Sequence, residues 1–414
     1  MTNLVCIDIF AGAGGLALGF HKANIMGLFA IEKDPMAFET LSANFLEDNA
    51  PYHNFSQWPE WLQKKSFDIN EILGNLVLRR HLLDLQGKID IVCGGPPCQG
   101  FSVGGMRDGN DSRNNLPIKY LEFVSLVKPR VIIFENVDGM ARPFLSKPSS
   151  FKGAFLDWLV NKLGELGYVA AYKIIDASKF GVPQIRKRLI IFGVQKELLD
   201  GSKTVSEFFD LMEELRPEFL KEKGLSLEHP VTVFEALEDL NNANRIPCPD
   251  SSKFLSTTYK TPQSVFSALM RTGIPDLTVP DSHRFSFHGN KTIEFYKMVH
   301  EKQMYGRLPK SVLIEYGTKK DKKVLLDPGM PASTITTHPD EFVHYSEPRI
   351  ITVREMARLQ SFPDNFVFRG RYTINGPRRR FDVARCSQVG NAVPPMLAEA
   401  IGRTVKKYLN LLSR

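Results

Sequence analysis

The sequence predicts an α/β fold with a mostly parallel sheet, followed by a smaller and less regular domain. Three observations lead to this prediction. Short apolar runs alternate with stretches of helical spacing from residue 1 to about residue 194, and the alternation fails after that point. A glycine-rich loop follows the first apolar run. Polar or reactive side chains follow several later runs, where the ends of parallel strands would place them at one edge of the sheet.

The first two expected strands frame a ligand-binding loop. The apolar run 4–7 leads into the loop DIFAGAGG at 8–15, and residues 16–20 then have helical spacing. Backbone N–H groups of such a loop can approach a ligand closely at the start of a helix. A second strand at 27–31 ends at Glu32, where doubly wound folds place an acid that binds ribose hydroxyls. Together they predict a ribose-bearing cofactor, although nucleotide and flavin enzymes share the loop and such an acid is often a solvated helix cap.

The next apolar run, 89–93, leads into the turn GGPPCQGFS at 94–102. Two prolines stiffen this turn and its glycines permit tight or left-handed backbone, so Cys98 is held in a constrained position. A thiolate attacks electrophilic carbon well, which predicts a nucleophilic cysteine. A lone cysteine is more often a small buried hydrophobe, and the surrounding motifs argue against that interpretation. The glycine-rich stretch after Cys98 is expected to close over a ligand, with Ser102 and Arg113 as contacts; a long solvated loop is the alternative.

Two further motifs place charged side chains near this turn. The apolar run 129–134 ends at Glu135, which should share a crevice with the glycine loop and the reactive turn. The motif QIRKR at 184–188 precedes another strand, and its alternation puts Arg186 and Arg188 on one face. Two arginines on one face indicate a site for an anion or a base edge. A basic edge strand that opposes aggregation is the alternative.

Composition narrows the class of protein without deciding it. The chain has 414 residues, a formal net charge of +7 and a pI near 9.0, which favour a polyanionic partner. Its five cysteines show neither the spacing of a metal site nor a disulfide framework, so no metal is implied. We see no secretory leader and no membrane-spanning run, and we expect a cytoplasmic protein with no membrane partner.

Six motifs, taken in order along the whole chain, resemble those of the bacterial DNA (cytosine-5)-methyltransferase family. The proline-cysteine turn and the closing GNAVPP are highly diagnostic together. The six are DIFAGAGG at 8–15, GGPPCQGFS at 94–102, ENV at 135–137, QIRKR at 184–188, VREMARLQSFPD at 353–364 and QVGNAVPP at 388–395. The resemblance implies a Rossmann-like, S-adenosylmethionine-dependent methyltransferase core, plus a target-recognition domain, acting on double-stranded DNA.

The resemblance also implies a reaction. Cys98 would attack carbon 6 of a cytosine flipped out of the duplex, and carbon 5 would take the methyl group of S-adenosylmethionine, leaving S-adenosylhomocysteine. Glu135 would bind and protonate ring nitrogen 3, for which it must carry a proton at neutral pH. Arg188 would contact the exocyclic oxygen of cytosine, with Arg186 supporting it or a phosphate. Their positive charge would also favour the thiolate.

The residues that the resemblance assigns to the cofactor lie near the first two strands and near the end of the chain. Asp84 and Leu85 are weaker matches than the others, because Asp90 competes for the same role. The expected cofactor contacts are Phe10, Gly12, Gly14, Glu32, Asp84, Leu85, Pro97, Asn391 and Ala392.

The motifs divide the chain into three parts and suggest where DNA is bound. The parts are a catalytic core at 1–194 with an insertion at 45–82, a target-recognition domain at 195–347, and closing motifs at 348–414. The last helix, about 395–412, should pack back on the core. Within the recognition domain we expect DNA contacts at 282–284 and Thr334. Six arginines between Arg369 and Arg385 are expected to contact phosphates, with a solvated charge run as the alternative.

Other functions and partners must be weighed against this one. A tRNA cytosine-5-methyltransferase shares the chemistry. A nucleotide-dependent oxidoreductase shares the glycine loop and Glu32 but leaves the proline-cysteine turn unexplained. A non-catalytic DNA-binding protein would not need every catalytic position intact. Because restriction-modification is the commonest setting for such chains, a cognate restriction endonuclease acting separately is an expected partner, and the enzyme is expected in the bacterial cytoplasm, on the nucleoid through its DNA.

Overall fold

The computed structural model describes residues 4–97, 115–141, 155–199, 201, 204–318, 322–373, 376, 378 and 381–412. The chain forms two compact units. The first consists of residues 1–176, 187–217 and 397–414, and the second of residues 177–186 and 218–396. This division differs from the one expected from the motifs, since the first half of the QIRKR motif belongs to the second unit. The boundaries at 194 and 347 stay a prediction about function.

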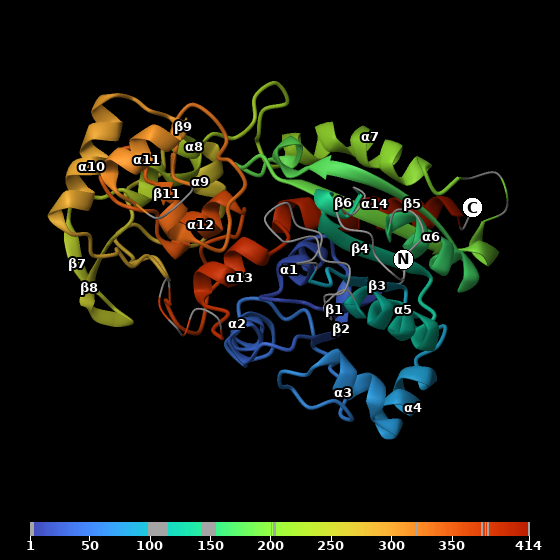
Figure 1. Ribbon diagram of the computed structural model, residues 1–414. Coiled ribbons are helices and arrows are strands. Elements are labelled where there is room, and N and C mark those ends of the chain that lie inside the picture. The colour runs from blue at the N-terminus through green and yellow to red at the C-terminus, as the bar shows by residue number, and fades with distance from the viewer. Residues whose placement is uncertain are drawn as a thin grey trace. The chain divides into compact units, whose positions relative to one another are not determined.

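The first unit is built on a six-stranded sheet (Figure 1). Its strands are β1 (Val5–Ile9), β2 (Met26–Ile31), β3 (Ile91–Gly94), β4 (Val131–Val137), β5 (Tyr168–Asp176) and β6 (Lys187–Gln195). They lie in the order β2-β1-β3-β4-β6-β5. The first four in this order run parallel, and β6 runs antiparallel to both β4 and β5. The predicted α/β class with a mostly parallel sheet is therefore confirmed.

Helices cover both faces of this sheet (Figure 1). They are α1 (Gly15–Lys22), α2 (Pro35–Phe45), α3 (Ile69–Gly74), α4 (Leu76–Asp84), α5 (Leu116–Val127), α6 (Phe155–Glu165), most of α7 (Glu207–Glu222) and most of α14 (Pro395–Leu412). On one face, the ring of Tyr120 from α5 lies 5.1 Å from that of Phe134 in β4. On the other face, Phe192 of β6 contacts Phe208 of α7 at 3.9 Å and Tyr408 of α14 at 5.1 Å, measured between ring centroids. The last helix therefore packs on the sheet of the first unit.

The expected insertion at 45–82 contains α3 and α4 and is tied into the same core. The indole rings of Trp58 and Trp61 pack edge-on against Phe29 of β2, with centroid distances of 6.3 and 5.6 Å. Trp61 also stacks on His81 of α4 at 4.9 Å. Two tryptophans of this segment thus contact the sheet itself, and an independent role for the insertion stays a prediction.

The second unit is less regular and consists of short helices and two-stranded sheets. Its helices are α8 (Val233–Leu237), α9 (Val265–Met270), α10 (Asn290–Glu301), α11 (Lys310–Tyr316), α12 (Val353–Leu359) and α13 (Arg385–Asn391). Its strands are β7 (Arg245–Cys248), β8 (Ser251–Thr257), β9 (Gly306–Arg307), β10 (Val324–Leu325) and β11 (Phe342–Val343), of which β7 pairs antiparallel with β8 and β10 parallel with β11. Single 3₁₀ turns lie at Ala177–Phe180, Glu238–Leu240 and Pro339–Glu341 in this unit, and at Asp138–Ala141 and Lys196–Leu198 in the first.

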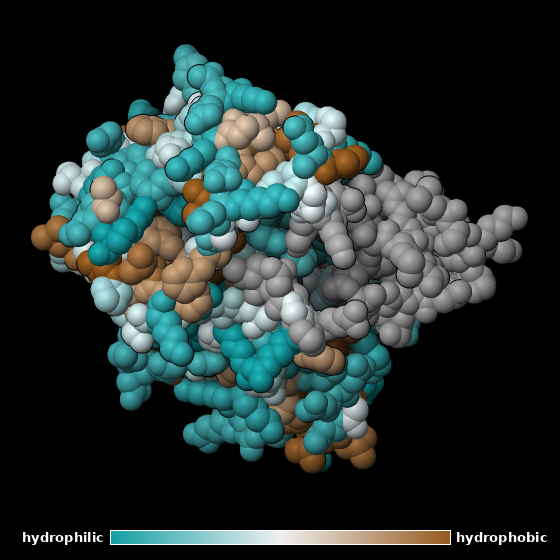
Figure 2. Space-filling model, turned by 60° about the vertical axis from the view of Figure 1, so that its left-hand side comes forward, coloured by the Kyte–Doolittle hydropathy of each residue, from teal (hydrophilic) through white to brown (hydrophobic). Residues whose placement is uncertain are grey.

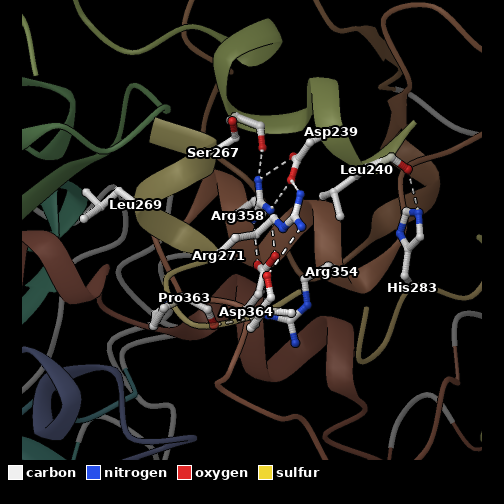
Figure 3. Close-up of polar contacts among 12 residues, drawn as sticks. Asp239, Leu240, Ser267, Leu269, Arg271, His283, Arg354, Arg358, Pro363 and Asp364 are labelled. Atoms are coloured by element: carbon white, nitrogen blue, oxygen red, sulfur yellow. Dashed lines mark hydrogen bonds and ion pairs between the residues drawn. The ribbon is translucent and has the colours of Figure 1, made fainter. Parts of the chain in front are cut away.

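A network of fully buried charges holds the second unit together (Figure 3). Arg358 of α12 donates to Asp239 at 2.9 Å and to Asp364 at 2.6 Å, and none of the three side chains is exposed. Arg354, one turn earlier, donates to Asp281 at 3.1 Å and to the carbonyl of Phe366 at 2.7 Å. The two carboxylates hold the pKa of Arg358 well above its usual value, against the effect of burial. The charged residues of the motif VREMARLQSFPD therefore form buried ion pairs that connect separate segments of this unit, and we call this network the internal brace.

Replacing Arg358 with methionine should destabilise the second unit by about 3–5 kcal/mol, because Asp239 and Asp364 would stay buried without their cation. Thermal and urea unfolding would measure the loss. The matched control is Lys162→Met in α6, which breaks the surface pair with Glu165 and should change stability by less than about 0.5 kcal/mol. Equal unfolding curves for the two variants would show that the buried network does not brace the unit.

Candidate functional site

The carboxyl ends of four neighbouring strands meet at one edge of the sheet. In the register of the sheet, Ile9 lies beside both Ile31 and Gly94, and Gly94 lies beside Phe134. The residues that follow these positions are the glycine loop, Glu32, the proline-cysteine turn and Glu135. The sheet therefore brings together four of the motifs that the sequence singled out, as expected of a ligand site in an open α/β fold.

The glycine loop connects β1 to the start of α1. Gly14 caps the helix with a φ of +93°, and a Cβ there would come 2.7 Å from the ring of Phe45, so only glycine fits. Gly12 has a φ of +57°, and a Cβ at this position would have no atom within 4 Å, so the loop is open on this side. Phe10 also has a positive φ of 60°, a strained conformation that is uncommon for a residue with a side chain. The loop therefore begins with a strained residue, Phe10, and has free space beside its backbone at Gly12.

Glu32, directly after β2, contacts the glycine loop, and we refer to the loop and this acid together as the cradle. One carboxylate oxygen accepts from the N–H of Gly12 at 2.8 Å, and the other accepts from the N–H of Asp34 at 2.7 Å. Burial raises the pKa of Glu32, while these backbone N–H groups act in the opposite direction. An open loop at a helix start, with a half-buried acid one strand away, has the donors and acceptors that a ribose-bearing cofactor needs. The residues present therefore fit S-adenosylmethionine.

The other expected cofactor residues are placed less directly. Asp84 is the last residue of α4 and Leu85 its half-buried C-cap. The competing candidate, Asp90, accepts from the N–H of Val5 at 2.9 Å and pairs with Arg130 at 3.0 Å. Its carboxylate therefore already has partners at the start of β1 and just before β4. Pro97 is exposed after the end of β3, and Asn391 and Ala392 belong to the second unit. Their contacts with a cofactor stay predictions.

Glu135 and Arg188 form an ion pair at the end of β4. The distance from Arg188 Nε to Glu135 Oε1 is 2.9 Å, and both side chains are about nine-tenths buried. A Cβ on Gly95 would come 2.7 Å from Glu135 Oε2, so the glycine lets the reactive turn approach the acid. The side-chain amide of Asn136 donates to the carbonyl of Pro96 at 3.0 Å and fixes the start of that turn. Burial lowers the pKa of Arg188, and the carboxylate of Glu135 opposes this shift.

Three residues expected at the site lie outside the described part of the chain. They are Cys98, Ser102 and Arg113. The described chain ends at Pro97 before this gap, and the roles of these three residues stay predictions.

Arg186 is the last residue of its segment in the second unit, whereas Arg188 belongs to the first. Its side chain is buried in the second unit, where it donates to the carbonyls of Gly390 at 2.7 Å, Ala392 at 3.1 Å and Ile335 at 3.0 Å. These contacts tie the QIRKR motif to the closing GNAVPP motif. The role expected of Arg186, supporting Arg188 or contacting a phosphate, stays a prediction.

The expected DNA contacts also differ in their surroundings. Thr334 is exposed, although its hydroxyl donates to the carbonyl of Ile185 at 2.8 Å. His283 is fully buried, with Nδ1 2.8 Å from the hydroxyl of Thr352. Its Nε2 lies 3.0 Å from the carbonyl of Leu240 (Figure 3). Such a histidine supports the fold and does not face a ligand.

The arginine-rich stretch is partly neutralised within the second unit. Arg385 pairs with Asp250 at 2.6 Å, and Arg371 with Asp382 at 3.2 Å. Arg369 lies 3.7 Å from a carboxylate oxygen of Asp281. Fewer of its charges are therefore available for phosphates than the sequence suggests.

Asp8, at the start of the glycine loop, is a buried acid beneath the cradle. Its side chain is fully buried, and this burial raises its pKa from 3.8 to about 8. The charge of Glu32 adds to this shift, while Cys93 and the backbone of Ala17 oppose it. At neutral pH the carboxyl is therefore mainly protonated in the folded chain and ionised in the unfolded chain.

We expect this difference to make stability fall as pH rises. A carboxyl whose pKa is higher in the folded chain than in the unfolded chain stabilises the fold by binding its proton. This stabilisation is complete below pH 3.8, the ordinary pKa, and it is lost as the pH rises to about 8, the pKa in the folded chain. The Asp8→Asn variant cannot titrate, so its stability should fall less steeply over this range, by up to a few kcal/mol. Urea unfolding from pH 5 to pH 8.5 would measure both slopes, with Asp157→Asn on the exposed face of α6 as control. Identical slopes for Asp8→Asn and the unmodified chain would contradict the expectation.

Two kinds of feature are absent from the described residues. None of their helices is both long and apolar enough to cross a membrane. No group of three or more His, Cys, Asp or Glu side chains in these ranges could hold a metal ion.

Comparison with known proteins supplies the family. A sequence model of the C-5 cytosine-specific DNA methylases matches residues 4–407. The type II methyltransferase M.Bpa9945I of Bacillus paralicheniformis is 30% identical over 485 aligned positions, which cover 98% of this chain and 99% of that protein. M1.HphI of Haemophilus parahaemolyticus, also a type II methyltransferase, is 28% identical, with 98% of this chain and 87% of the relative covered. Among solved structures, a candidate DNA modification methyltransferase encoded within an E. coli prophage aligns with a TM-score of 0.63 at 25% identity, over 99% of this chain and 100% of that one.

Proposed function

The chain belongs to the C-5 cytosine-specific DNA methylase family, and on this premise we propose how its residues transfer a methyl group from S-adenosylmethionine to carbon 5 of cytosine in duplex DNA. The observation that carries the proposal is the meeting of the Glu135–Arg188 pair with the glycine loop at one edge of the sheet. A cofactor cradle on one side and an acid with a cation on the other are the parts that this reaction requires.

Cys98 is the nucleophile of the proposed reaction. Its thiolate forms a bond to carbon 6 of the extruded cytosine, and the electron pair of the ring double bond moves toward carbon 5. The bound cofactor supplies the methyl group that carbon 5 takes. Water acting as a base then takes the carbon 5 proton, the electron pair of that C–H bond restores the ring double bond, and the carbon 6–sulfur bond breaks to release the thiolate. Extruding the base costs a few kcal/mol, so the pocket must offer it polar partners.

Glu135 and Arg188 are proposed as those partners. Arg188 donates to the exocyclic oxygen of cytosine, and Glu135 gives a proton to ring nitrogen 3 as the sulfur attacks. In the described structure the guanidinium of Arg188 contacts the acid directly, which favours the carboxylate form. Arrival of the base would draw Arg188 away from Glu135 and let the acid take up its proton. The ion pair is therefore the resting state of the site.

The cofactor is proposed to lie along the glycine loop. Gly12 and Gly14 let the backbone approach it, Phe10 packs beside it, and Glu32 accepts hydrogen bonds from its ribose. Titration with S-adenosylhomocysteine by calorimetry would test this site without any need for methyl transfer.

The substrate and the biological setting can be tested together. Expression in a host that lacks cytosine methylation, followed by bisulfite sequencing, should reveal 5-methylcytosine at one short DNA sequence. Competition between duplex DNA and tRNA separates this proposal from the tRNA-modifying alternative, because the preferred substrate suppresses methylation of the other. Because relatives are type II methyltransferases, we also propose a restriction-modification setting. In that case an extract of the source cells should cut the unmethylated target and spare DNA that this enzyme has methylated.

A further inference from the structure

The second unit contains a column of alternating aromatic rings and guanidinium groups outside the proposed site. In order, its members are Phe287, Phe254, Arg284, Tyr372 and Arg385, and we refer to them as the aromatic column. The rings of Phe287 and Phe254 stack with centroids 4.8 Å apart. The guanidinium of Arg284 lies 4.0 Å from the ring centroids of both Phe254 and Tyr372. Arg385 lies 4.2 Å from the centroid of Tyr372.

Hydrogen bonds hold the inner part of the column in place. Asp250 accepts from the hydroxyl of Tyr372 at 2.8 Å and from Arg385 at 2.6 Å. Arg284 donates to the hydroxyl of Ser251 at 3.3 Å. Each cation–π contact adds about 0.5–2 kcal/mol. The column is therefore a rigid support, and little side-chain entropy remains to be lost when its outer end binds a ligand.

The outer end of the column is exposed. Phe287 is 69% exposed, whereas the other members are half-buried or buried. Arg284 covers one face of the Phe254 ring, so Phe287 stacks on the opposite face of that ring. One face of the Phe287 ring therefore contacts Phe254, and its other face points away from the column. Figure 2 shows that apolar side chains interrupt a largely hydrophilic surface on the face turned to the viewer. An exposed phenylalanine held rigidly in this way presents a flat surface for stacking.

A pocket with both apolar and polar walls lies against the same residue. It has a volume of about 300 Å³, and Phe287 forms part of its wall together with His288, Thr292, Tyr296 and Lys323. Lys323 is buried, and its ammonium group donates to the hydroxyl of Tyr296 at 3.0 Å. Asp340 also lines the pocket, so its wall combines an aromatic face with hydroxyls, an imidazole, an ammonium group and a carboxyl group. Such a wall suits a ligand with one flat apolar part and several polar atoms, donors among them.

We propose that the exposed face of Phe287 stacks on a base of the DNA substrate, with polar atoms of the same nucleotide in the adjacent pocket. This rests on the proposed function and names a substrate contact that the family motifs do not include. In a duplex both faces of a base are covered by its neighbours, so an aromatic side chain reaches a base face only where it enters and partly unstacks a base step or where a base has been extruded, and phenylalanine is one of the side chains that proteins insert in this way. The net charge of +7 favours a polyanion over an apolar protein partner. Arg284, expected from the sequence to contact DNA, then acts through the column by supporting Phe287.

Variants of Phe287 test the stacking directly, and its exposure makes them compatible with folding. Phe287→Ala should raise the KM for cognate duplex roughly 5- to 150-fold, since stacking contributes about 1–3 kcal/mol per base. Phe287→Leu, which keeps apolar area without a π-face, should show most of this loss, and Phe287→Trp should show little of it. The kcat at saturating DNA should change much less than the KM. Leu227→Ala, an exposed apolar side chain outside the column, is the matched control.

Fluorescence of the Phe287→Trp variant gives a readout that a structural role would not affect. The three natural tryptophans, Trp58, Trp61 and Trp158, belong to the first unit, so the unmodified protein measures their response to DNA. Duplex DNA should quench the added tryptophan beyond that response. Unchanged KM in Phe287→Ala, or no added quenching, would overturn the inference. A sedimentation shift from dimer to monomer in Phe287→Ala with unaltered DNA binding would assign the ring to a second copy of the chain instead. If the unmodified protein itself fails to methylate DNA, the proposed function fails first, which keeps the two results distinguishable.

Discussion

The Cys98→Ser variant should lose methyl transfer by at least about three orders of magnitude while it still binds S-adenosylhomocysteine and DNA. A serine hydroxyl is far less ionised and less nucleophilic than a thiol, and removing a covalent nucleophile is among the most damaging changes to an enzyme. Transfer of tritiated methyl groups to duplex DNA would measure the loss. Calorimetry with S-adenosylhomocysteine would show that the cofactor site survives.

The control for this prediction is Cys248→Ser in the second unit. Cys248 donates to Asp250 at 3.2 Å, and a serine hydroxyl can make the same contact, so its activity should stay close to that of the unmodified enzyme. A duplex with 5-fluorocytosine at the target adds a second readout. Since the fluorine cannot leave as the carbon 5 proton does, the covalent adduct with Cys98 should accumulate and survive denaturing electrophoresis. Absence of this adduct in an enzyme that methylates normal DNA would exclude the cysteine mechanism.

The sheet could be predicted from the sequence because its strands are short apolar runs that end at recognisable motifs. Buried parallel strands must be apolar on both faces, and their carboxyl ends must share an edge, so the neighbourhood of Glu32 and Glu135 followed from the order of the motifs. The contact between Glu32 and Gly12 is the clearest case, since it joins two motifs at 2.8 Å. Local patterns and chain topology together were sufficient here.

The partners of the arginines could not be predicted in the same way. Alternation states which side chains share a face and says nothing about what packs on that face. Arg186 donates to Gly390, which is 204 residues away in sequence, and only the folded chain brings them together. The brace around Arg358 was missed for a related reason: a charged helix normally predicts a solvated face, while α12 is buried throughout. The one available signal was Arg354, Glu355 and Arg358 falling between apolar residues just before an aspartate.

The residues proposed to contact DNA in the second unit could not be predicted from motifs alone. His283 stands in a polar triplet that resembles a DNA contact, yet burial lowers its pKa to about 4 and both ring nitrogens have partners within the unit. Phe287, four residues later, carries no polar group and matches no motif. Its significance comes from exposure and from the rings and cations behind it, which are properties of the folded chain.

The Glu135→Gln variant should lower kcat by about 10²- to 10⁴-fold, the usual range for removing a general acid. Glutamine has the same shape and can still donate a hydrogen bond to ring nitrogen 3, but it has no proton to transfer. The base would therefore bind while attack by the thiolate on carbon 6 becomes slow. Single-turnover methylation at saturating DNA and cofactor would measure the chemical step, and Glu165→Gln on the surface of α6 is the matched control.

Loss of the ion pair with Arg188 must be separated from loss of the acid, since the Gln variant removes both. Glu135→Asp retains an ionisable acid on a shorter side chain, so it should keep more activity than the glutamine variant despite poorer geometry. Its rate should also vary with pH, because a carboxyl group must gain and lose a proton in each turnover, whereas the residual rate of the glutamine variant should lack that ionisation. If glutamine supports turnover within about threefold of glutamate at every pH, Glu135 only orients the base, and the proton on ring nitrogen 3 must come from elsewhere.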